Sequence, residues 1–483
     1  MAFFIKTIIA YFWFAIKQVM NKHSSIHFDI SERKILLRFM DIASVLSLLY
    51  FMDAFFDFDY FKINLENWKW TVVLAGYLSV FGSVFELYDL QKASKFESIV
   101  QNIIITSFVI VLLYLLTPFF TPTLPENRLQ IVYFYLSINA ALVIWRYAYI
   151  TLISATRFFK RVILIGNASD IDEMVMTLQK SDPNYKVVGF INTSSVAYIS
   201  KKFKDLIEVE VASIESTVTQ HSISEIVVAA PAAGKITASL YNQLILLLEN
   251  GTPIRSYTDV YESITHRIPI QHVDKDFYLH FPFSRSNQNK LYLFCRRILD
   301  VLFSILGLTL GFVLFPIILV GNFWANRGPL FYSHIRVGIN GKEFRIYKLR
   351  SMVRNAEKDG PQYADALDTR VTKFGRFLRK SRLDEIPQFI NVIKGDMSVI
   401  GPRPERPFFV KKYSNDLPFY EVRHLIRPGI TGWAQVHARY GSSEQDTLEK
   451  LQYDLFYMKR RSLALDINIL IKTLSTVIFY RGQ

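Results

Sequence analysis

The stretch VLFSILGLTLGFVLFPIILVGNFWAN (residues 301–326) contains no charged side chain. It is long enough to cross a membrane, because a spanning helix needs about 20 mainly apolar residues. However, Arg296 and Arg297 precede it and Arg327 follows it, and cationic flanks favour the cytoplasmic side at both ends. Pro316 removes a backbone donor near the middle and favours a break in the helix. We therefore expect a re-entrant helix that bends at Pro316 and returns to the same face, with a kinked full crossing as the alternative.

Four further apolar stretches lie nearer the start of the chain. They occupy residues 42–56, 70–85, 98–125 and 129–145. The first contains Asp53, and the other three carry no charge. The loops between them alternate in charge, and cationic loops stay in the cytoplasm. The sequence therefore predicts a four-helix transmembrane unit over 37–156 with both ends in the cytoplasm, preceded by a retained interfacial segment over 1–36.

The charge of the chain is concentrated in its last third. The 483 residues include 56 Lys and Arg against 42 Asp and Glu, a formal net charge of +14. Beyond Asn322 the counts are 28 and 16, so this region carries +12 of that charge. Beside an apolar helix, such a basic region favours membrane lipids and phosphates as partners over nucleic acid. A single cysteine, Cys295, excludes an intramolecular disulfide and a Cys-based zinc finger.

An α/β pattern occupies the region between the membrane segments, expected over 157–285. Short apolar runs alternate there with helical patterns, which is typical of a parallel sheet. The runs are KRVILIG (160–166), KVVGFIN (186–192) and EIVVAAP (225–231). The first ends in GNASDI, with one glycine where a dinucleotide-binding turn needs three. We expect a Rossmann-like cytoplasmic domain with a regulatory or scaffolding role and no tight NAD(P) binding.

The residues that suggest chemistry lie in RFLRKSRLDEIPQFINVIKGDMSVIGPRPERP (376–407). Apolar residues at helical spacing follow Asp384 and Glu385, and Gly395 is a suitable helix stop. Ser381 stands three residues before Asp384, which predicts a cap that places the acidic pair at the start of this helix. Carboxylates surrounded by arginines are typical of a phosphate site that also holds a divalent cation. An acidic helix cap without further function is the alternative.

Four segments resemble the bacterial sugar transferase family, the monotopic phosphoglycosyl transferases that begin glycan assembly on a polyprenyl phosphate. They are FYSHIRVGINGKEFRIYKLRSM (331–352), DTRVTKFGRFLRKSRLDEIPQFINVIKGDMSVIGPRPER (368–406), RHLIRPGITGWAQV (423–436) and SLALDINILIKT (462–473). The resemblance is continuous over roughly 290–483 and, with the preceding layout, extends to the polyprenyl-phosphate hexose-1-phosphate transferases. It implies a membrane protein of α plus α/β class, with a linker and re-entrant helix over 286–326 and a catalytic domain over 327–483.

The resemblance also implies a two-step transfer. Asp384 would attack the β-phosphate of a UDP-sugar and release UMP, and Glu385 would help to hold Mg²⁺. Undecaprenyl phosphate would then accept the sugar 1-phosphate, with glucose as the first expectation for the sugar and galactose as the second. Roles in binding substrate phosphates transfer by motif to Lys348, Arg379, Arg403, Arg439 and Asp466.

Three positions depart from the family pattern. Phe315 precedes Pro316 where serine is usual, VHARYG (436–441) replaces an Asn-Gly-Arg version, and His334 stands where glutamine is common. We assign His334 no role from the sequence. The family further implies a multi-pass protein of the bacterial inner membrane with its catalytic domain on the cytoplasmic face, and it leaves homo-oligomerisation open.

Two other functions compete with this interpretation. A membrane-anchored nucleotide-sugar dehydratase or epimerase would need the Gly-rich turn that is missing at Gly166, and it would leave the 376–407 segment unexplained. A non-enzymatic membrane scaffold with a basic lipid-binding domain would not require the pair of Asp384 and Glu385 among arginines.

Overall fold

The computed structural model describes most of the chain. The described residues are 30–56, 58–93, 96–152, 159–182, 184–194, 203, 206–229, 236–270, 289–354, 356, 368–438, 441 and 443–478. They belong to two compact units, Met1–Thr265 and His266–Gln483. Each unit is described by itself below.

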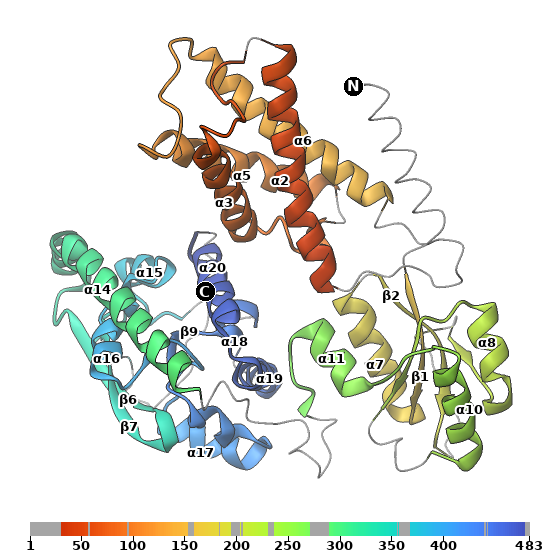
Figure 1. Ribbon diagram of the computed structural model, residues 1–483. Helices are drawn as coiled ribbons and strands as arrows, with labels where there is room; N and C mark the ends of the chain where they lie inside the picture. The colour runs from red at the N-terminus through yellow and green to blue at the C-terminus, as the bar shows by residue number, and fades with distance from the viewer. Residues whose placement is uncertain are drawn as a thin grey trace. The chain divides into compact units, whose positions relative to one another are not determined.

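The first unit begins with a group of helices that pack side by side (Figure 1) and share an apolar core. They are α2 (Ile30–Phe55), α3 (Trp68–Val84), the short α4 (Leu90–Ala93), α5 (Phe96–Leu115) and α6 (Leu129–Leu152). An ion pair of 2.7 Å between the buried side chains of Asp41 and Arg146 joins α2 to α6. Helices are therefore present at all four expected stretches. By length and composition, α2 and α6 could cross a membrane, whereas α5 contributes a shorter apolar helix; a four-span unit stays a prediction.

A parallel five-stranded sheet completes the first unit, in the order β3-β2-β1-β4-β5. Its strands are β1 (Lys160–Gly166), β2 (Tyr185–Asn192), β3 (Ile207–Glu208), β4 (Glu225–Val228) and β5 (Ile254–Ser256). Its main helices are α7 (Ala168–Ser181), α8 (Ile214–Gln220), α10 (Ala238–Glu249) and α11 (Tyr257–Thr265). Because successive strand residues face opposite sides, Val162 and Leu164 of β1 pack with α7 and α11, and Ile163 and Ile165 pack with α8 and α10. The predicted parallel α/β domain is confirmed.

The second unit begins earlier than the predicted boundary near residue 285. Ile268 and Ile270 belong to the apolar core of this unit, and the indole of Trp433 donates to the carbonyl oxygen of His266. These residues were predicted to belong to the Rossmann-like domain. The sequence does not show this, because their side chains are buried against a core that the later part of the chain supplies.

The long apolar helix α14 (Lys290–Gly321) continues as a π-helical turn, η4 (Asn322–Asn326). Together they form the third stretch long and apolar enough to cross a membrane among the described residues. Pro316 lies inside one continuous helix, so the helix is not interrupted there, and a bend at Pro316 stays a prediction. A proline removes one hydrogen bond of a helix, and a helix of this length retains enough others to continue through it. Re-entry into the membrane stays a prediction.

One face of α14 is fixed to the rest of the unit. The Asp300 carboxylate accepts from the Ser398 hydroxyl at 2.9 Å and from the Val399 backbone N–H at 2.8 Å, both in β8 (Ser398–Ile400). Further along, glycines allow close packing: a Cβ at Gly307 would meet the Phe389 ring at 2.3 Å, and one at Gly311 would meet Ile386 at 2.6 Å. The apolar helix is thus packed directly against the segment that carries Asp384 and Glu385.

The remaining elements surround a small core with two short sheets. The antiparallel hairpin consists of β6 (Phe331–Val337) and β7 (Glu343–Leu349), and β8 pairs in parallel with β9 (Gly429–Thr431). The helices are α15 (Lys373–Lys380), α16 (Gln388–Lys394), α17 (Pro407–Asp416), α18 (Trp433–His437), α19 (Glu444–Arg460) and α20 (Leu463–Ile478), with the 3₁₀ turns η6 (Leu383–Glu385) and η7 (Tyr420–Leu425).

Candidate active site

The β6–β7 hairpin presents alternate side chains on one face. Its register pairs Tyr332 with Lys348 and His334 with Ile346. Because side chains two residues apart on a strand share a face, Tyr332, His334 and Arg336 of β6 lie on the same face as Lys348 of β7. The alternation follows from the sequence once the strand register is known. It places a lysine, a histidine and an arginine along one face of the hairpin.

The acidic pair lies in the η6 turn and not in the first turn of an α-helix. Ser381 ends α15, with its hydroxyl donating back to the carbonyl oxygen of Phe377 at 2.8 Å. Arg382 follows in the left-handed region with φ of 59°. The predicted cap by Ser381 is therefore wrong. The predicted stop is confirmed, because Gly395 has a φ of 91° at the end of α16.

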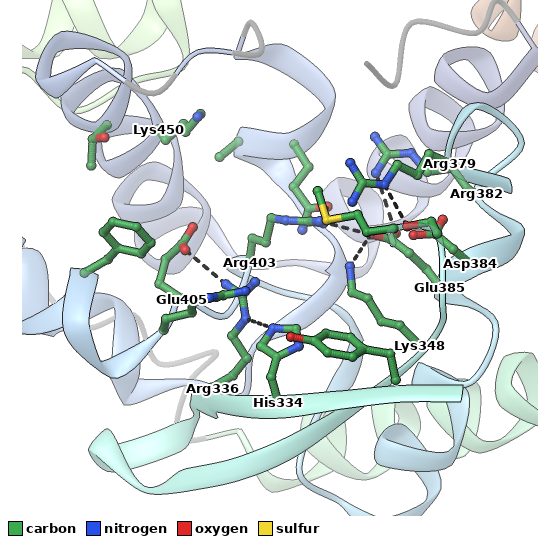
Figure 2. A pocket seen from close by; sticks show the side chains of 18 of the residues that line it. His334, Arg336, Lys348, Arg379, Arg382, Asp384, Glu385, Arg403, Glu405 and Lys450 are labelled. Carbon is green, nitrogen blue, oxygen red and sulfur yellow. Dashed lines mark hydrogen bonds and ion pairs between the residues drawn. The ribbon is translucent and has the colours of Figure 1, made fainter. Parts of the chain in front are cut away.

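Three cations converge on Glu385. Its carboxylate lies 3.0 Å from an Arg403 guanidinium nitrogen, 3.3 Å from Lys348 Nζ and 3.6 Å from an Arg382 nitrogen. In the described part of the chain, all three of these ion pairs go to Glu385 and none to Asp384 (Figure 2). Both acidic residues are buried, each with 6% of its surface exposed. The three cations therefore fix the carboxylate of Glu385, whereas the adjacent carboxylate of Asp384 takes no part in these ion pairs.

The cations separate the protonation behaviour of the two carboxyl groups. Burial opposes ionisation of Glu385, but Arg403, Lys348 and Arg382 outweigh it and hold the pKa of Glu385 well below its usual range. Burial raises the pKa of Asp384 to about 6, against the opposing effect of Lys348. Burial also lowers the pKa of Lys348, while Glu385 counteracts this. Opposite charges favour and burial disfavours the ionised form, so Glu385 stays ionised when Asp384 begins to bind a proton.

The turn GPRPE (401–405) positions Arg403. Gly401 lies close to the chain entering β9, where an added Cβ would meet the carbonyl oxygen of Arg427 at 2.5 Å. The carbonyl oxygen of Arg403 accepts from the Arg423 guanidinium at 3.0 Å, and Arg423 forms a buried ion pair of 2.8 Å with Asp454. Buried charges need partners, so the ion pair with Asp454 holds the guanidinium of Arg423 in place. That guanidinium in turn holds the backbone of the turn at Arg403.

These residues line one cavity of about 400 Å³. This volume lies within the usual range for sites that bind small molecules, roughly 300–1,000 Å³. Among the described residues, its walls carry eleven Arg and Lys side chains against four Asp and Glu. Figure 2 shows Asp384 and Glu385 near Arg379 and Arg382 on one side, and His334, Arg336 and Glu405 further along the wall. A cavity with this excess of positive charge suits a ligand with several negative charges, such as a diphosphate.

The donor set fits Mg²⁺ only if the ligand supplies further oxygens. Among the described residues, no group of three or more His, Cys, Asp and Glu side chains could hold a metal ion. Mg²⁺ is commonly bound by one or two carboxylates together with substrate phosphates and water. The adjacent carboxylates of Asp384 and Glu385 satisfy that requirement and are the residues that would hold it.

Five of the sequence-predicted site residues line the cavity together. These are Lys348, Arg379, Asp384, Glu385 and Arg403. Asp466 does not line it: its carboxylate accepts from the hydroxyls of Tyr292 and Tyr457, each at 2.7 Å, inside the packing of α14, α19 and α20. A role of Asp466 at a phosphate therefore has no support in this geometry. Arg439 lies outside the described residues.

Sequence reasoning missed several cavity residues. Arg336 forms an ion pair of 3.1 Å with Glu405, and Arg350 donates to the carbonyl oxygens of Pro329 and Asn326. Arg336 and Arg350 both fall in the family-like segment 331–352. The alternation of the hairpin could have identified Arg336, because it shares a face with Lys348.

Comparisons with known proteins match two parts of the chain to two different families. Residues 291–480 match the family described as bacterial sugar transferase, and residues 83–237 match that described as CoA-binding domain. The first match contains every described residue of the acidic cluster and the hairpin.

Several characterised bacterial proteins are similar to this chain. One is the UDP-N-acetylgalactosamine-undecaprenyl-phosphate N-acetylgalactosaminephosphotransferase of Aeromonas hydrophila, 39% identical over 226 residues, which are 47% of this chain and 52% of the relative. The UDP-glucose:undecaprenyl-phosphate glucose-1-phosphate transferase of Xanthomonas campestris pv. campestris is 40% identical over 190 residues, 39% of each chain. The protein of the same name from Caulobacter vibrioides is 36% identical over 187 residues, 38% of this chain and 69% of the relative. The chain thus covers about half or less of the first two.

Proposed function

Since the chain belongs to the bacterial sugar transferase family, we propose that it transfers a sugar 1-phosphate from a UDP-sugar to undecaprenyl phosphate. The observation that carries this proposal is the acidic pair in the cationic cavity, with Glu385 held by Lys348, Arg382 and Arg403. Similar relatives are named as undecaprenyl-phosphate transferases of N-acetylgalactosamine phosphate and of glucose 1-phosphate. The sugar is the open part of the proposal, since glucose, galactose and N-acetylgalactosamine all remain candidates.

In the first step, a carboxylate oxygen of Asp384 attacks the β-phosphorus of the UDP-sugar. The bond from this phosphorus to the oxygen of UMP breaks, and UMP leaves with the electron pair. In the second step, a phosphate oxygen of undecaprenyl phosphate attacks the same phosphorus and Asp384 leaves, which gives an undecaprenyl diphosphate sugar. A carboxylate is a suitable nucleophile for such a covalent step. Phosphoryl transfer depends mainly on positioning and on neutralising charge, which Lys348, Arg379 and Arg403 would provide. Mg²⁺ would add charge neutralisation on the diphosphate when bound.

The proposed setting is the cytoplasmic face of the bacterial inner membrane. The helix α14 is long and apolar enough to enter a membrane. Because it packs on Ile386, insertion of this helix would bring the acidic pair near the lipid surface. Cationic residues flank it at both ends, which favours re-entry. Single cysteines at Asn289 and Asn340, in a Cys295→Ser background, should both be labelled from the cytoplasm only. Labelling of the second from the outside would establish a full crossing.

The covalent step can be tested without the acceptor. Purified full-length protein is mixed with UDP-glucose, UDP-galactose or UDP-N-acetylgalactosamine, each labelled in the sugar. We expect release of up to one UMP per protein, with label retained on the peptide that contains Asp384. Undecaprenyl phosphate should then remove the label as a lipid product.

Asp384→Asn keeps the shape of the side chain and should abolish labelling and reduce turnover by several powers of ten. Asp416→Asn is the matched control, because Asp416 is exposed at the end of α17 and does not line the cavity. Turnover that always requires both substrates together, with no label on the protein, would disprove the role of Asp384 as nucleophile.

A further inference from the structure

His334 is held in one tautomer by its neighbour. The Nε of Arg336 donates a hydrogen bond of 2.7 Å to Nε2 of His334. A guanidinium group has no acceptor, so Nε2 must be unprotonated and the ring proton must lie on Nδ1. The opposite edge of the same arginine donates to the Pro404 carbonyl oxygen and to Glu405. The imidazole is therefore fixed between the hairpin and the GPRPE turn.

The charges around His334 keep it neutral. Burial and the positive charges of Arg336 on β6, Lys348 on β7, and Arg406 and Arg403 next to the turn lower its pKa to about 2. The nearest acidic group across the turn, Glu405, is itself paired with Arg336. Nδ1 thus carries its proton throughout the physiological range, and neither ring nitrogen is able to take up another proton there.

The Nδ1–H group lacks a protein partner. It is buried and has no hydrogen-bond partner in the part of the chain that the structure describes. An unsatisfied buried donor costs free energy, about 1–3 kcal/mol. His334 also lines the cavity, but its Nδ1 is closed to water in this structure. An oxygen atom of a ligand bound there would reach Nδ1 after a small movement of the ring or of its neighbours, and would then remove this cost.

We propose that His334 is a substrate-binding residue whose Nδ1–H donates to an oxygen of the nucleotide sugar. This inference rests on the proposed function for the identity of the ligand. His334 and Lys348 are diagonal neighbours on one face of the hairpin, a spacing of roughly 7–8 Å. The Nδ1–H group of His334 therefore lies on the same face of the hairpin as Lys348, next to the cluster of cations around Glu385. The nucleotide sugar has oxygen acceptors at that distance from its reacting phosphate, whereas the polyprenyl chain of the acceptor has none beyond its phosphate.

Equilibrium binding tests the proposal without turnover. The dissociation constants of the three UDP-sugars are measured by calorimetry with full-length Asp384→Asn protein, alone and combined with changes at His334. His334→Leu should raise the Kd about tenfold, the loss of one buried hydrogen bond. His334→Gln should stay within about threefold, because its amide oxygen accepts from Arg336 while its N–H₂ group replaces Nδ1–H. His221→Leu, in the first unit and outside the cavity, is the control and should change nothing.

A double-variant cycle separates direct contact from an effect through Arg336. Because Arg336 and His334 are hydrogen-bonded, their effects need not add, but a group that acts only through another gives no further change once that partner is removed. In an Arg336→Leu background, His334→Leu should therefore still raise the Kd, by a smaller factor than in the native background. In otherwise native protein, it should leave the KM for undecaprenyl phosphate unchanged.

The inference is overturned by an unchanged Kd in His334→Leu, by failure of glutamine to restore binding, or by full dependence on Arg336. The proposed reaction is judged separately by UMP release. Protein that releases no UMP but shows the tenfold change in Kd would refute the reaction and support the role of His334. Protein that releases UMP while the Kd is insensitive to His334 would do the reverse.

Discussion

Packing between α14 and the acidic segment leads to our most specific prediction, that Gly311→Ala damages catalysis at a distance. Gly311 contacts Ile386, which directly follows Glu385 in sequence. A Cβ at Gly311 would lie 2.6 Å from Cγ2 of Ile386, whereas ordinary contact begins at 3.4 Å, so a displacement of about 0.8 Å is needed. Isoleucine is branched at Cβ and stiff about χ1, so its backbone must move with it.

The magnitude follows from two opposing effects. Overpacking costs about 1–3 kcal/mol, and replacing glycine by alanine within a helix gains about 0.5–1 kcal/mol. The variant should therefore fold with a small net loss of stability. Catalysis is more sensitive, because a misplacement of about 1 Å lowers rates about a hundredfold. We expect kcat to fall by about ten- to a hundredfold while the Kd for the UDP-sugar changes little.

The assay is the initial rate of UMP release in lipid nanodiscs with saturating substrates. The matched control is Gly76→Ala, because Gly76 lies inside α3 and an added Cβ there has nothing within 4 Å. This control should keep full activity. A kcat for Gly311→Ala within about twofold of the native value would refute the coupling of α14 to the acidic pair.

Three further predictions concern the cavity. The rate of the first UMP burst should fall as the pH drops below about 6, because burial raises the pKa of Asp384 to about 6 and a protonated carboxyl cannot attack; a flat profile down to about pH 5 would contradict this. Arg403→Lys should lower kcat/KM at least about tenfold, since an ammonium group cannot replace a planar fork between Glu385 and a phosphate, and an unchanged kcat/KM would mean that charge alone is enough. Arg423→Met should lower the free energy of unfolding by about 3–5 kcal/mol, because Asp454 stays buried without its partner; urea unfolding measures this, and a further change of Asp454→Leu should restore most of the loss.

Sequence patterns predicted the elements that depend on interactions between residues close together in the sequence. The run at 160–166 forms β1 with the same bounds, and Gly395 ends α16 in the left-handed region as expected. The helix start after Ser381 could not be predicted from spacing. Pro387 lacks an N–H, so a helix that began at Leu383 would lose its bond to Leu383. Instead, the backbone N–H of Glu385 donates to the carbonyl oxygen of Arg382, and that of Ile386 donates to the carbonyl oxygen of Leu383, each three residues back.

The candidate site was predictable in composition but not in assignment of partners. The cations near Asp384 and Glu385 in sequence suggested a phosphate site, and five named residues line one cavity. Which of the two carboxylates is paired with cations depends on Lys348 and Arg403. Lys348 lies in the β6–β7 hairpin and Arg403 in the GPRPE turn, and neither is a near neighbour of the acidic pair in sequence. Asp466 shows the opposite case. Its motif on α20 predicted a role at a substrate phosphate, but its carboxylate accepts hydrogen bonds from two tyrosine hydroxyls. Long-range partners of this kind carry no periodic signal.

In the proposed mechanism, the arrangement around the acidic pair gives the two adjacent carboxylates different roles. A group that attacks phosphorus must be ionised yet weakly held, since a carboxylate with three ion pairs would have to break them as its charge decreases. A group that fixes cations must stay ionised whatever its surroundings. Glu385 meets the second requirement through Lys348, Arg382 and Arg403, and Asp384 meets the first because these ion pairs do not involve it. The cations held by Glu385 remain close enough to neutralise a phosphate at Asp384. One carboxylate therefore organises the positive charge, and its neighbour is left available for the transfer.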